Sequence, residues 1–466
     1  MTRQRGILFF TLVSLILTTA VTPSQAGVVD ISECRIPASK SQTVSLGFPL
    51  RPERISSNKT AQILVVPIAP SDVPNHQFSQ DLKDNYINAA GDIEKLSFGR
   101  AKINYIFAPV HRSQLTVNDF IALRNNQQSS FQNKDLTKST FGFVRNTIKE
   151  LDLGTNFTNI DSVILEVGPL LTPFGVAEAF QFYSNNQESW FDPIRTNEGY
   201  INNAVLLGYH SDAIAHEIMH NYGLTDLYGS FTSPVSLSLM ASDNLTLLNY
   251  EKWILGWIDD SNVTCLDAKN VLQGLSIDSS VEIKNTENQL AIINTGSGTG
   301  LVIEVIRDNF NGRRLAFYSL NNEERPPITM FPPARATGAL DISGPAAIGG
   351  LLKSPKFSLL VSNITQDEIS LALIPESLKS TDEAKNLISQ SIANRDAGIS
   401  IARVAEAKAV AEAKAIAEAK AVAEAKAVTE AKALAKKKTT ITCIKGKSTK
   451  KVIAVNPKCP AGYKKK

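Results

Sequence analysis

Residues 216–226 read HEIMHNYGLTD, and this stretch decides what kind of domain the chain forms. On a helix, His216 and His220 are four residues apart, so they lie one turn apart on the same face. Both imidazoles can then bind one Zn²⁺ ion, and Glu217 can reach a water at that ion as general base. The pattern predicts a zinc-binding helix with a catalytic glutamate beside its first ligand.

A third ligand is expected just beyond this helix. Gly223 can adopt the left-handed backbone conformation that ends a helix, and the chain can then return Asp226 to the metal. Three protein ligands leave a fourth position for water, which distinguishes catalytic zinc from structural zinc. The alternatives are a core helix with two incidental histidines and a zinc site that has lost its activity.

Further motifs follow the zinc motif in a recognisable order. SLSLMAS occupies residues 236–242, and NYEKWILGWI occupies residues 249–258. This order resembles the immune inhibitor A family of secreted bacterial metallopeptidases. LSFGR at 96–100 is similar to that family's segment after the first helix, and LVIEVIR at 301–307 is similar to its Glu-x-Arg strand. The resemblance covers residues 60–320.

This resemblance implies an α+β, metzincin-like zinc peptidase domain in which Met240 is the Met-turn residue beneath the metal. A thioether is soft and apolar, so it can pack under the ligand histidines without competing for the metal; ordinary core packing is the alternative role of Met240. The sequence lacks a tyrosine two positions after Met240, where several metzincins place a transition-state stabiliser. Tyr228 or Tyr222 can supply a phenol instead, and a buried structural role is the alternative for both.

The N-terminus has the features of a secretory signal peptide over residues 1–26. Arg3 and Arg5 precede a mostly apolar stretch that is too short to span a bilayer comfortably, and residues 24–26 form a small-x-small cleavage site. We therefore expect a secreted protein that is extracellular or associated with the cell surface.

The expected mature chain contains four cysteines, Cys34, Cys265, Cys443 and Cys459. An even number in an exported chain indicates disulfides. Cys443 and Cys459 are isolated together near the C-terminus, which favours a bond between them and leaves Cys34 for Cys265. The alternative role for Cys34 is a thiolate that caps the zinc in a latent form.

Hydrophobic patterns divide the rest of the chain into segments. An N-terminal segment over 27–60 precedes a catalytic domain over 61–265, in which a polar, helical stretch at 116–150 looks like an insertion. Short β-rich segments over 266–375 predict a sandwich-like second domain. The expected strands are 61–68, 102–107, 162–167, 204–207, 280–283, 290–293, 301–306, 315–320, 357–361 and 369–374, and the expected first helix is 79–97.

Residues 376–438 predict a long helix. From Ala405 onward, a repeat of Ala-Glu-Ala-Lys-Ala-Val/Ile consists of strong helix formers. Its larger apolar residues recur every six positions and form no heptad seam. We expect a solvated, semi-rigid spacer, with a partner-binding coil as the alternative.

The last segment, 439–466, is expected to be a Lys-rich, disulfide-closed tail. Residues 436–466 contain eleven lysines and no acidic residue, whereas the whole chain has a net charge of only +3. This asymmetry predicts attachment to an anionic cell-envelope surface, and a merely solubilising tail is the alternative. We expect no nucleic-acid partner, because the tail offers one aromatic residue, Tyr463.

Together these features predict a secreted zinc-dependent endopeptidase. It would hydrolyse peptide bonds of protein or peptide substrates through a zinc-activated water, with Glu217 as general base and one catalytic Zn²⁺ as cofactor. Nothing in the sequence indicates or excludes a structural Ca²⁺. The alternative function is that of a cell-surface adhesive or binding protein with a vestigial metalloprotease domain.

Overall fold

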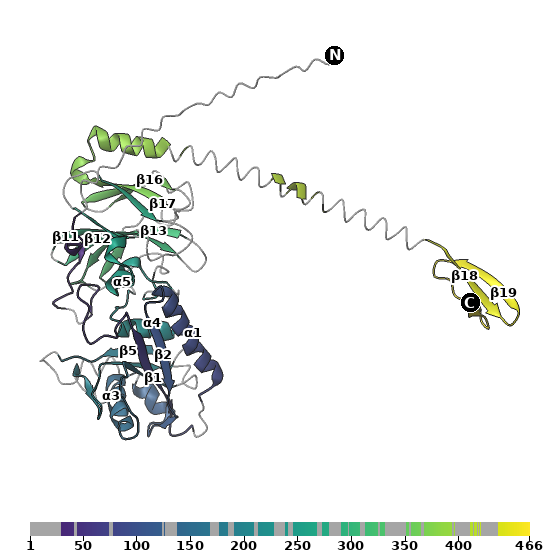
Figure 1. Ribbon diagram of the computed structural model, residues 1–466, viewed down its shortest axis with the longest axis horizontal. Coiled ribbons are helices and arrows are strands. Elements are labelled where there is room, and N and C mark those ends of the chain that lie inside the picture. Colours follow the sequence, from purple (N-terminus) through teal and green to yellow (C-terminus); the bar gives the residue numbers. More distant parts are fainter. Residues whose placement is uncertain are drawn as a thin grey trace, which may run out of the picture. The chain divides into compact units, whose positions relative to one another are not determined.

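In the computed structural model, the chain forms two compact units, Met1–Arg395 and Asp396–Lys466 (Figure 1). The described residues are 29–41, 44–73, 78–123, 125, 138–167, 177–184, 191–208, 213–227, 238–240, 246–267, 273–278, 290–296, 298–307, 313–324, 327–330, 351–353, 356–364, 368–393, 396, 411–412, 414–416, 418, 420 and 437–466. The expected signal peptide lies outside them. Within these ranges, no helix is both long and apolar enough to cross a bilayer.

A six-stranded sheet organises the N-terminal part of the first unit. Its strand order is β2-β1-β4-β8-β5, and β3 pairs with β1. All pairs are parallel except β5 with β8, so β5 is an antiparallel strand at one edge. The four strands expected before the helix with His216 and His220 are confirmed. The bounds are β1 Thr60–Ala69, β2 Lys102–Phe107, β3 His111–Arg112, β4 Ser162–Glu166, β5 Ala177–Gln181 and β8 Asn203–Leu207, with β6 Ile194–Arg195 and β7 Tyr200–Ile201 pairing separately.

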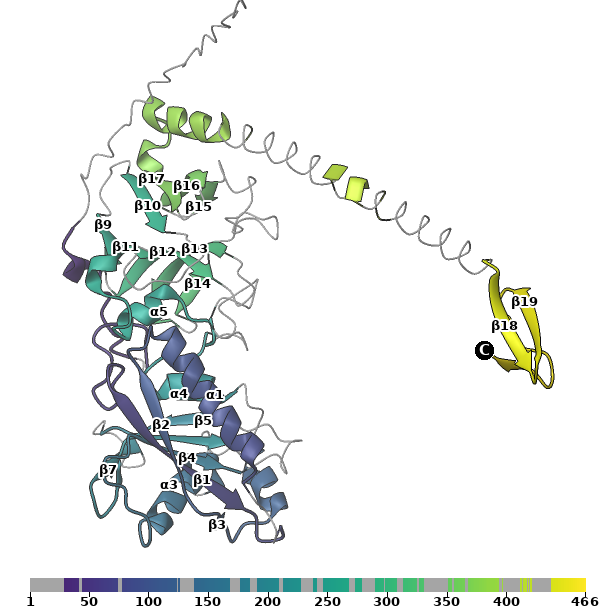
Figure 2. The same ribbon diagram turned by 45° about the vertical axis from the view of Figure 1, so that its right-hand side comes forward.

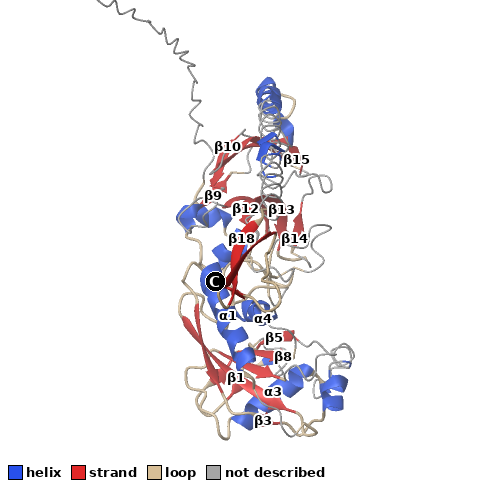
Figure 3. Ribbon diagram, turned by 90° about the vertical axis from the view of Figure 1, so that its right-hand side faces the viewer, coloured by secondary structure: helices blue, strands red, loops and turns tan. Residues whose placement is uncertain are grey.

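Helices cover both faces of this sheet (Figures 2 and 3). Helices α1 (Gln80–Leu96) and α4 (Ala213–Asn221) contact one another on one face, and α3 (Thr140–Leu151) lies on the other. Successive side chains of β1 point to opposite faces of the sheet. Ile63 packs in the core with α1 and α4, whereas Leu64 packs with α3. The central strands β1, β4 and β8 are therefore buried on both sides, as strands of parallel sheets generally are, whereas edge strand β2 has an exposed face.

The stretch at 116–150 differs from the prediction. It is helical at 117–123 and in α3, but α3 buries most of its residues, including Phe141, Val144 and Ile148. These side chains form a core cluster with β1, β4 and β8. This helix is thus part of the domain core and is not a polar insertion.

The β-rich region consists of two packed sheets. One has the order β14-β13-β12-β11-β9 and the other β10-β17-β16-β15. Their facing side chains, among them Ile303 and Phe317 from the first sheet and Leu359 and Leu371 from the second, form one buried cluster. Five of the six strands expected in this region are present, and the one at 280–283 lies outside the described residues. The bounds are β9 Val263–Leu266, β10 Gln273–Asp278, β11 Leu290–Gly296, β12 Thr299–Arg307, β13 Arg313–Asn321, β14 Ile328–Met330, β15 Leu351–Lys353, β16 Phe357–Ile364 and β17 Glu368–Pro375.

The five-stranded sheet also joins the core of the N-terminal part. The side chains on its second face, such as Ile292, Val302 and Tyr318, belong to the same buried cluster as α4 and α5 (Asn249–Ile254). The expected domain boundary at 265/266 falls inside β9, which pairs with β11. The regions 61–265 and 266–375 therefore share one continuous core.

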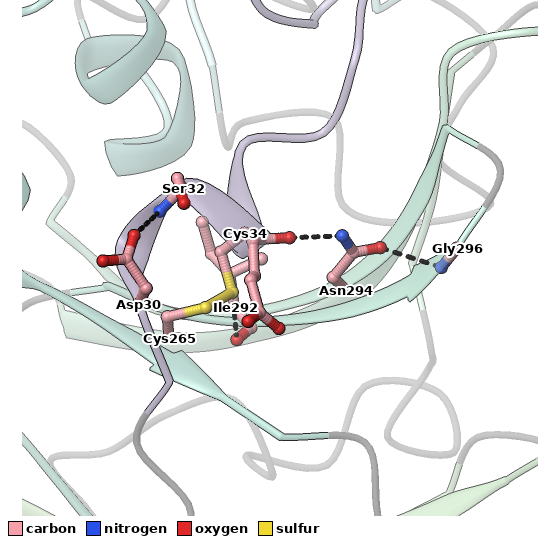
Figure 4. Close-up of a disulfide and its surroundings, with 8 residues drawn as sticks. Asp30, Ser32, Cys34, Cys265, Ile292, Asn294 and Gly296 are labelled. Carbon is pink, nitrogen blue, oxygen red and sulfur yellow. Dashed lines mark hydrogen bonds between the residues drawn. A yellow bond between two sulfur atoms is a disulfide. The ribbon is translucent and has the colours of Figure 1, made fainter.

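The N-terminal segment is fixed to this core by a disulfide (Figure 4). Cys34, at the end of the 3₁₀ helix η1 (Ile31–Cys34), is bonded to Cys265 on β9. Beside it, the Asn294 side chain donates a hydrogen bond to the Glu33 carbonyl and accepts one from the Gly296 amide. The expected pairing is confirmed, as is that of Cys443 with Cys459. The alternative role of Cys34 as a zinc-capping thiolate is wrong, because its sulfur is already bonded.

We expect the double variant Cys34→Ser/Cys265→Ser to lower the free energy of unfolding of the first unit by about 2–5 kcal/mol. The two residues are 231 positions apart, so the bond closes a long loop in the unfolded chain. Chemical denaturation followed by tryptophan fluorescence measures the change. Cys443→Ser/Cys459→Ser is the control and should leave that transition in place. A loss below about 1 kcal/mol in the first variant would contradict the prediction.

The end of the first unit differs from the expected spacer. Residues 382–393 form a helix whose N-cap is Thr381, which accepts a hydrogen bond from the Ala384 amide. Ala384 is fully buried against Leu360 and Ile374 of the four-stranded sheet. This helix is packed, so a solvated spacer can begin only after it. The short 3₁₀ helices η5 (Asp260–Asn262) and η7 (Glu376–Leu378) complete the first unit.

The second unit ends in a small three-stranded sheet. Strands β18 (Thr439–Lys445), β19 (Ser448–Ala454) and β20 (Lys464–Lys465) have the order β19-β18-β20. Within the Ala/Glu/Lys repeat, the described residues 411–412, 414–416, 418 and 420 are helical, as predicted.

Candidate metal centre

Helix α4 carries both predicted histidines and packs against the six-stranded sheet. It contacts β5 and β8, and its apolar residues Ile218 and Met219 lie in the core. The rings of His216 and His220 are 4.9 Å apart between centroids. The sequence spacing therefore places both imidazoles at one point, next to the edge strand β5.

Asp226 completes a group of three donors. Its Oδ1 lies 3.2 Å from Nε2 of His216 and 3.3 Å from Nε2 of His220. One donor atom from each of these three residues lies within 4.8 Å of the donor atoms of the other two. The sequence predicted this set, and the described residues bring it together.

Gly223 produces the turn that returns Asp226 to the histidines. It has a positive φ of 105°, and its amide donates to the His220 carbonyl. Any side chain here would be strained, and a Cβ would also lie only 3.1 Å from Cδ of Arg54. The Leu224 amide then donates to the Met219 carbonyl, which caps the end of α4 at Asn221, five residues before the aspartate.

Backbone carbonyls fix the orientation of both imidazoles. Nδ1 of His216 lies 2.7 Å from the Leu239 carbonyl oxygen, and Nδ1 of His220 lies 2.9 Å from the Leu224 carbonyl oxygen. A carbonyl can only accept, so each Nδ1 carries the proton when the ring is neutral. Each Nε2 faces Asp226, to which it donates a hydrogen bond when the ring is protonated, and it offers a lone pair to a metal when the ring is neutral. Metal-binding histidines usually have this second hydrogen bond.

Opposite charges dominate the electrostatics of the three donors. Burial by itself lowers the pKa of His220, but the Asp226 and Glu217 carboxylates outweigh it and hold that pKa above its ordinary value. Burial raises the pKa of Asp226, but its hydrogen bonds with both histidines outweigh burial and bring that pKa well below its ordinary value. Asp226 is therefore ionised, as a ligand must be.

Glu217 is buried beside the donors, with 6% of its surface exposed. Burial raises the pKa of this carboxyl, although His220 and His216 act in the opposite direction. The backbone amide of Ala179 on β5 donates a hydrogen bond to it. Edge strand β5 therefore orients the predicted general base.

Two more residues of β5 belong to this centre and were missed in the sequence. Gln181 donates a hydrogen bond through Nε2 to the His220 carbonyl. Burial raises the pKa of Glu178 to about 7, and the charge of Glu217 adds to this effect. Among the described residues, Oε2 of Glu178 has no hydrogen-bond partner. No sequence motif predicts a role for these residues, because it is the pairing of β5 with β8 that places β5 beside α4.

Met240 lies in a segment that supports the first histidine. Its side chain is fully buried, its carbonyl accepts from the Leu227 amide, and its amide donates to Oγ of Ser238. The neighbouring Leu239 supplies the carbonyl that orients His216. The placement fits a Met-turn, and the position of the thioether beneath a metal stays a prediction.

A buried glutamate anchors this segment. Glu251 on α5 accepts hydrogen bonds through Oε2 from the Ser238 hydroxyl at 2.6 Å and the Leu248 amide at 2.9 Å. Glu304 on β12 similarly accepts from the Asn249 amide and the Tyr318 hydroxyl. Both carboxyls are fully buried, and burial raises each pKa to about 7.

We expect the first unit to lose stability as pH rises from about 4.5 to 7. In this window the Glu251 and Glu304 carboxyls of the folded protein each retain a proton that the unfolded chain releases. Each of them therefore lowers the free energy of unfolding by about 1.4 kcal/mol for every pH unit. Glu251→Gln should flatten this slope and be more stable than the parent at pH 8. Its amide does not titrate, and with the nitrogen in place of Oε1 its oxygen keeps both hydrogen bonds that Oε2 accepts. Urea denaturation at pH 5, 6, 7 and 8 tests this, with exposed Glu94→Gln as control. Parallel slopes in all three proteins would refute it.

The two tyrosines have different outcomes. Tyr222 is fully buried and packs against Trp257, with ring centroids 5.9 Å apart, as its alternative structural role required. Tyr228 lies outside the described residues, so its role as transition-state stabiliser stays a prediction.

The described residues thus define a candidate mononuclear metal centre, with a buried carboxylate beside it. No known family of proteins matches the chain, and no curated protein is significantly similar to it. The resemblance to the immune inhibitor A family accordingly stays a prediction.

Proposed function

We propose that this protein is an exported zinc-dependent endopeptidase. The observation that carries the proposal is the convergence of Nε2 of His216, Nε2 of His220 and Oδ1 of Asp226, with buried Glu217 alongside. The fold that goes with it is α+β and metzincin-like, with the two packed β-sheets behind the catalytic part. Two disulfides favour an extracellular location.

The donor set fits zinc better than the hard cations. Two imidazole nitrogens and one carboxylate oxygen are common zinc ligands, whereas calcium and magnesium prefer oxygen ligands throughout. The three residues leave room for a fourth ligand. Bound zinc supplies a Lewis acid that activates water and polarises the scissile carbonyl.

A side chain of the protein, that of Glu217, transfers the proton. Glu217 accepts the proton of the attacking water and later passes it to the leaving amine. The Ala179 amide keeps its carboxylate oriented. His216 and His220 cannot serve in its place, since their Nε2 atoms face Asp226 and their Nδ1 atoms face backbone carbonyls.

Chelation and metal replacement test the proposal. The full-length protein should hydrolyse casein, lose this activity with 1,10-phenanthroline, and regain it on addition of about one equivalent of Zn²⁺ but not Ca²⁺. Recovery with Ca²⁺ alone would indicate a structural calcium site instead. Zinc binding without hydrolysis of casein, gelatin or a mixed peptide library would favour the alternative, an adhesive protein with a vestigial peptidase domain.

A further inference from the structure

The sheet of the second unit has one covered and one open face. In an antiparallel sheet, directly opposite residues share a face. Cys443 is opposite Lys450 and Lys465, so these three residues point to one side. That side is closed by the loop that contains Cys459, because Cys443 is fully buried and bonded to it. Lys445 lies along Gly462 on the same side.

The described residues of the opposite side are exposed or half-buried. Its central strand β18 presents Thr442 and Ile444, and the outer strand β19 presents Lys451 and Ile453. Ile453 is 63% exposed, although it is a large apolar residue in a regular strand. Its exposure shows that no core covers this end of the face.

Lysines flank the central strand of this open face. Lys451 is opposite Thr442 on one side, and Lys464 is opposite Ile444 on the other. The outer strands of a three-stranded sheet are two strand spacings apart, or about 10 Å. The two ammonium groups therefore border a strip of hydroxyl and methyl groups that runs along β18.

No side-chain carboxylate of the segment neutralises these charges, because residues 436–466 contain no acidic residue. The positive charge therefore favours a negatively charged ligand on this face. Threonine hydroxyls can hydrogen-bond sugar hydroxyls, and isoleucine methyls can pack on the C–H surface of a sugar ring. A sheet strip with charges on both borders suits an extended polymer.

We propose that the open face of this sheet binds an anionic polysaccharide of the cell envelope, with the polymer lying along β18 between Lys451 and Lys464. A membrane surface fits less well, because interfacial segments use Trp, Phe and Leu, which this face lacks. Single-stranded nucleic acid fits less well, because it requires aromatic side chains for base stacking. This proposal does not depend on the peptidase activity.

A pair of matched double variants in the full-length protein tests this. Lys451→Gln/Lys464→Gln removes two charges from the open face, and Lys450→Gln/Lys465→Gln removes two charges from adjacent positions on the covered face. Binding to immobilised polygalacturonate at 0.15 M salt should fall at least tenfold in the first variant and less than threefold in the second. Glu217→Gln should bind like the parent, which separates this test from that of the peptidase proposal.

Three outcomes would overturn the proposal. Equal losses in both double variants would show that only charge density matters, since each removes the same charge. Stronger binding to vesicles with 30% phosphatidylglycerol, or to DNA, than to polygalacturonate would identify a different partner. Unchanged binding of Ile453→Asn at 0.5 M salt, where screening weakens charge attraction, would show that the apolar strip makes no contact.

Discussion

Glu217→Gln is expected to lower the turnover of peptide hydrolysis by about 10²–10⁴-fold, because a positioned general base contributes this much. The amide has the same shape and keeps its hydrogen-bonding oxygen toward the Ala179 amide, but it cannot accept a proton. The three donors His216, His220 and Asp226 are untouched, so the variant should still bind about one zinc ion per chain. Single-turnover kinetics and metal analysis on the same preparation measure both properties.

Glu178→Gln is the matched control for this prediction. Glu178 is also buried, and the charge of Glu217 raises its pKa, but the Ala179 amide contacts Glu217 and not Glu178. Loss of this neighbouring charge should change turnover by no more than about tenfold, the equivalent of one pKa unit. Near-normal turnover in Glu217→Gln would reject Glu217 as the base. A larger loss in Glu178→Gln than in Glu217→Gln would transfer that role to Glu178.

Asp226→Ala is expected to weaken zinc binding by more than about 100-fold and to abolish hydrolysis. Changes to residues that merely support a metal ligand cost about 10–100-fold, so loss of a ligand itself should cost more. The variant also removes the carboxylate that lies 3.2 and 3.3 Å from the two imidazoles. Competition with a chromophoric chelator gives the affinity.

The control for this variant is Asp81→Ala on α1, which removes one exposed carboxylate far from the donors in sequence. It should keep the zinc affinity of the parent. Parent-like affinity in Asp226→Ala would show that another residue is the third ligand. Equal weakening in both variants would show only a general effect of negative charge.

The pairing of Glu251 with Ser238 links the β-rich sheets to the candidate centre. Glu304 on β12 fixes the start of α5, Glu251 on α5 fixes the segment with Met240, and that segment orients His216. Each of these three links is a direct hydrogen bond, and the residues between them are close in sequence. The β-rich region therefore contributes to the geometry of the centre as well as to the shared core.

Much of the centre was predictable because its pattern is local. His216 and His220 share a helix face through the four-residue spacing, and Gly223 allows the turn that brings Asp226 back. Three of the four strands before α4 were predictable from continuous apolar runs, which are typical of strands buried on both faces, and Lys102–Phe107 was predictable from its alternation. Pairing of the cysteines followed from their number and positions.

The errors and omissions concern contacts between distant segments. Helix α3 looked polar in sequence, yet its apolar face is covered by the sheet. The helix at 382–393 belonged to the expected spacer, yet Ala384 is buried against the four-stranded sheet. The tail strands β18 and β19 were not foreseen, because lysine and threonine give them no apolar alternation.

The sequence by itself determined the zinc motif, the disulfide partners, the helix-forming repeat and the charge of the tail. All of these depend on spacing or composition, which short stretches of chain carry within themselves. Only the tertiary structure decided that β5 orients Glu217, that Glu178, Glu251 and Glu304 are buried, and that one face of the tail sheet is open. Burial shifts the pKa of a carboxyl by removing water from around it, and the segments that exclude this water lie far away in sequence.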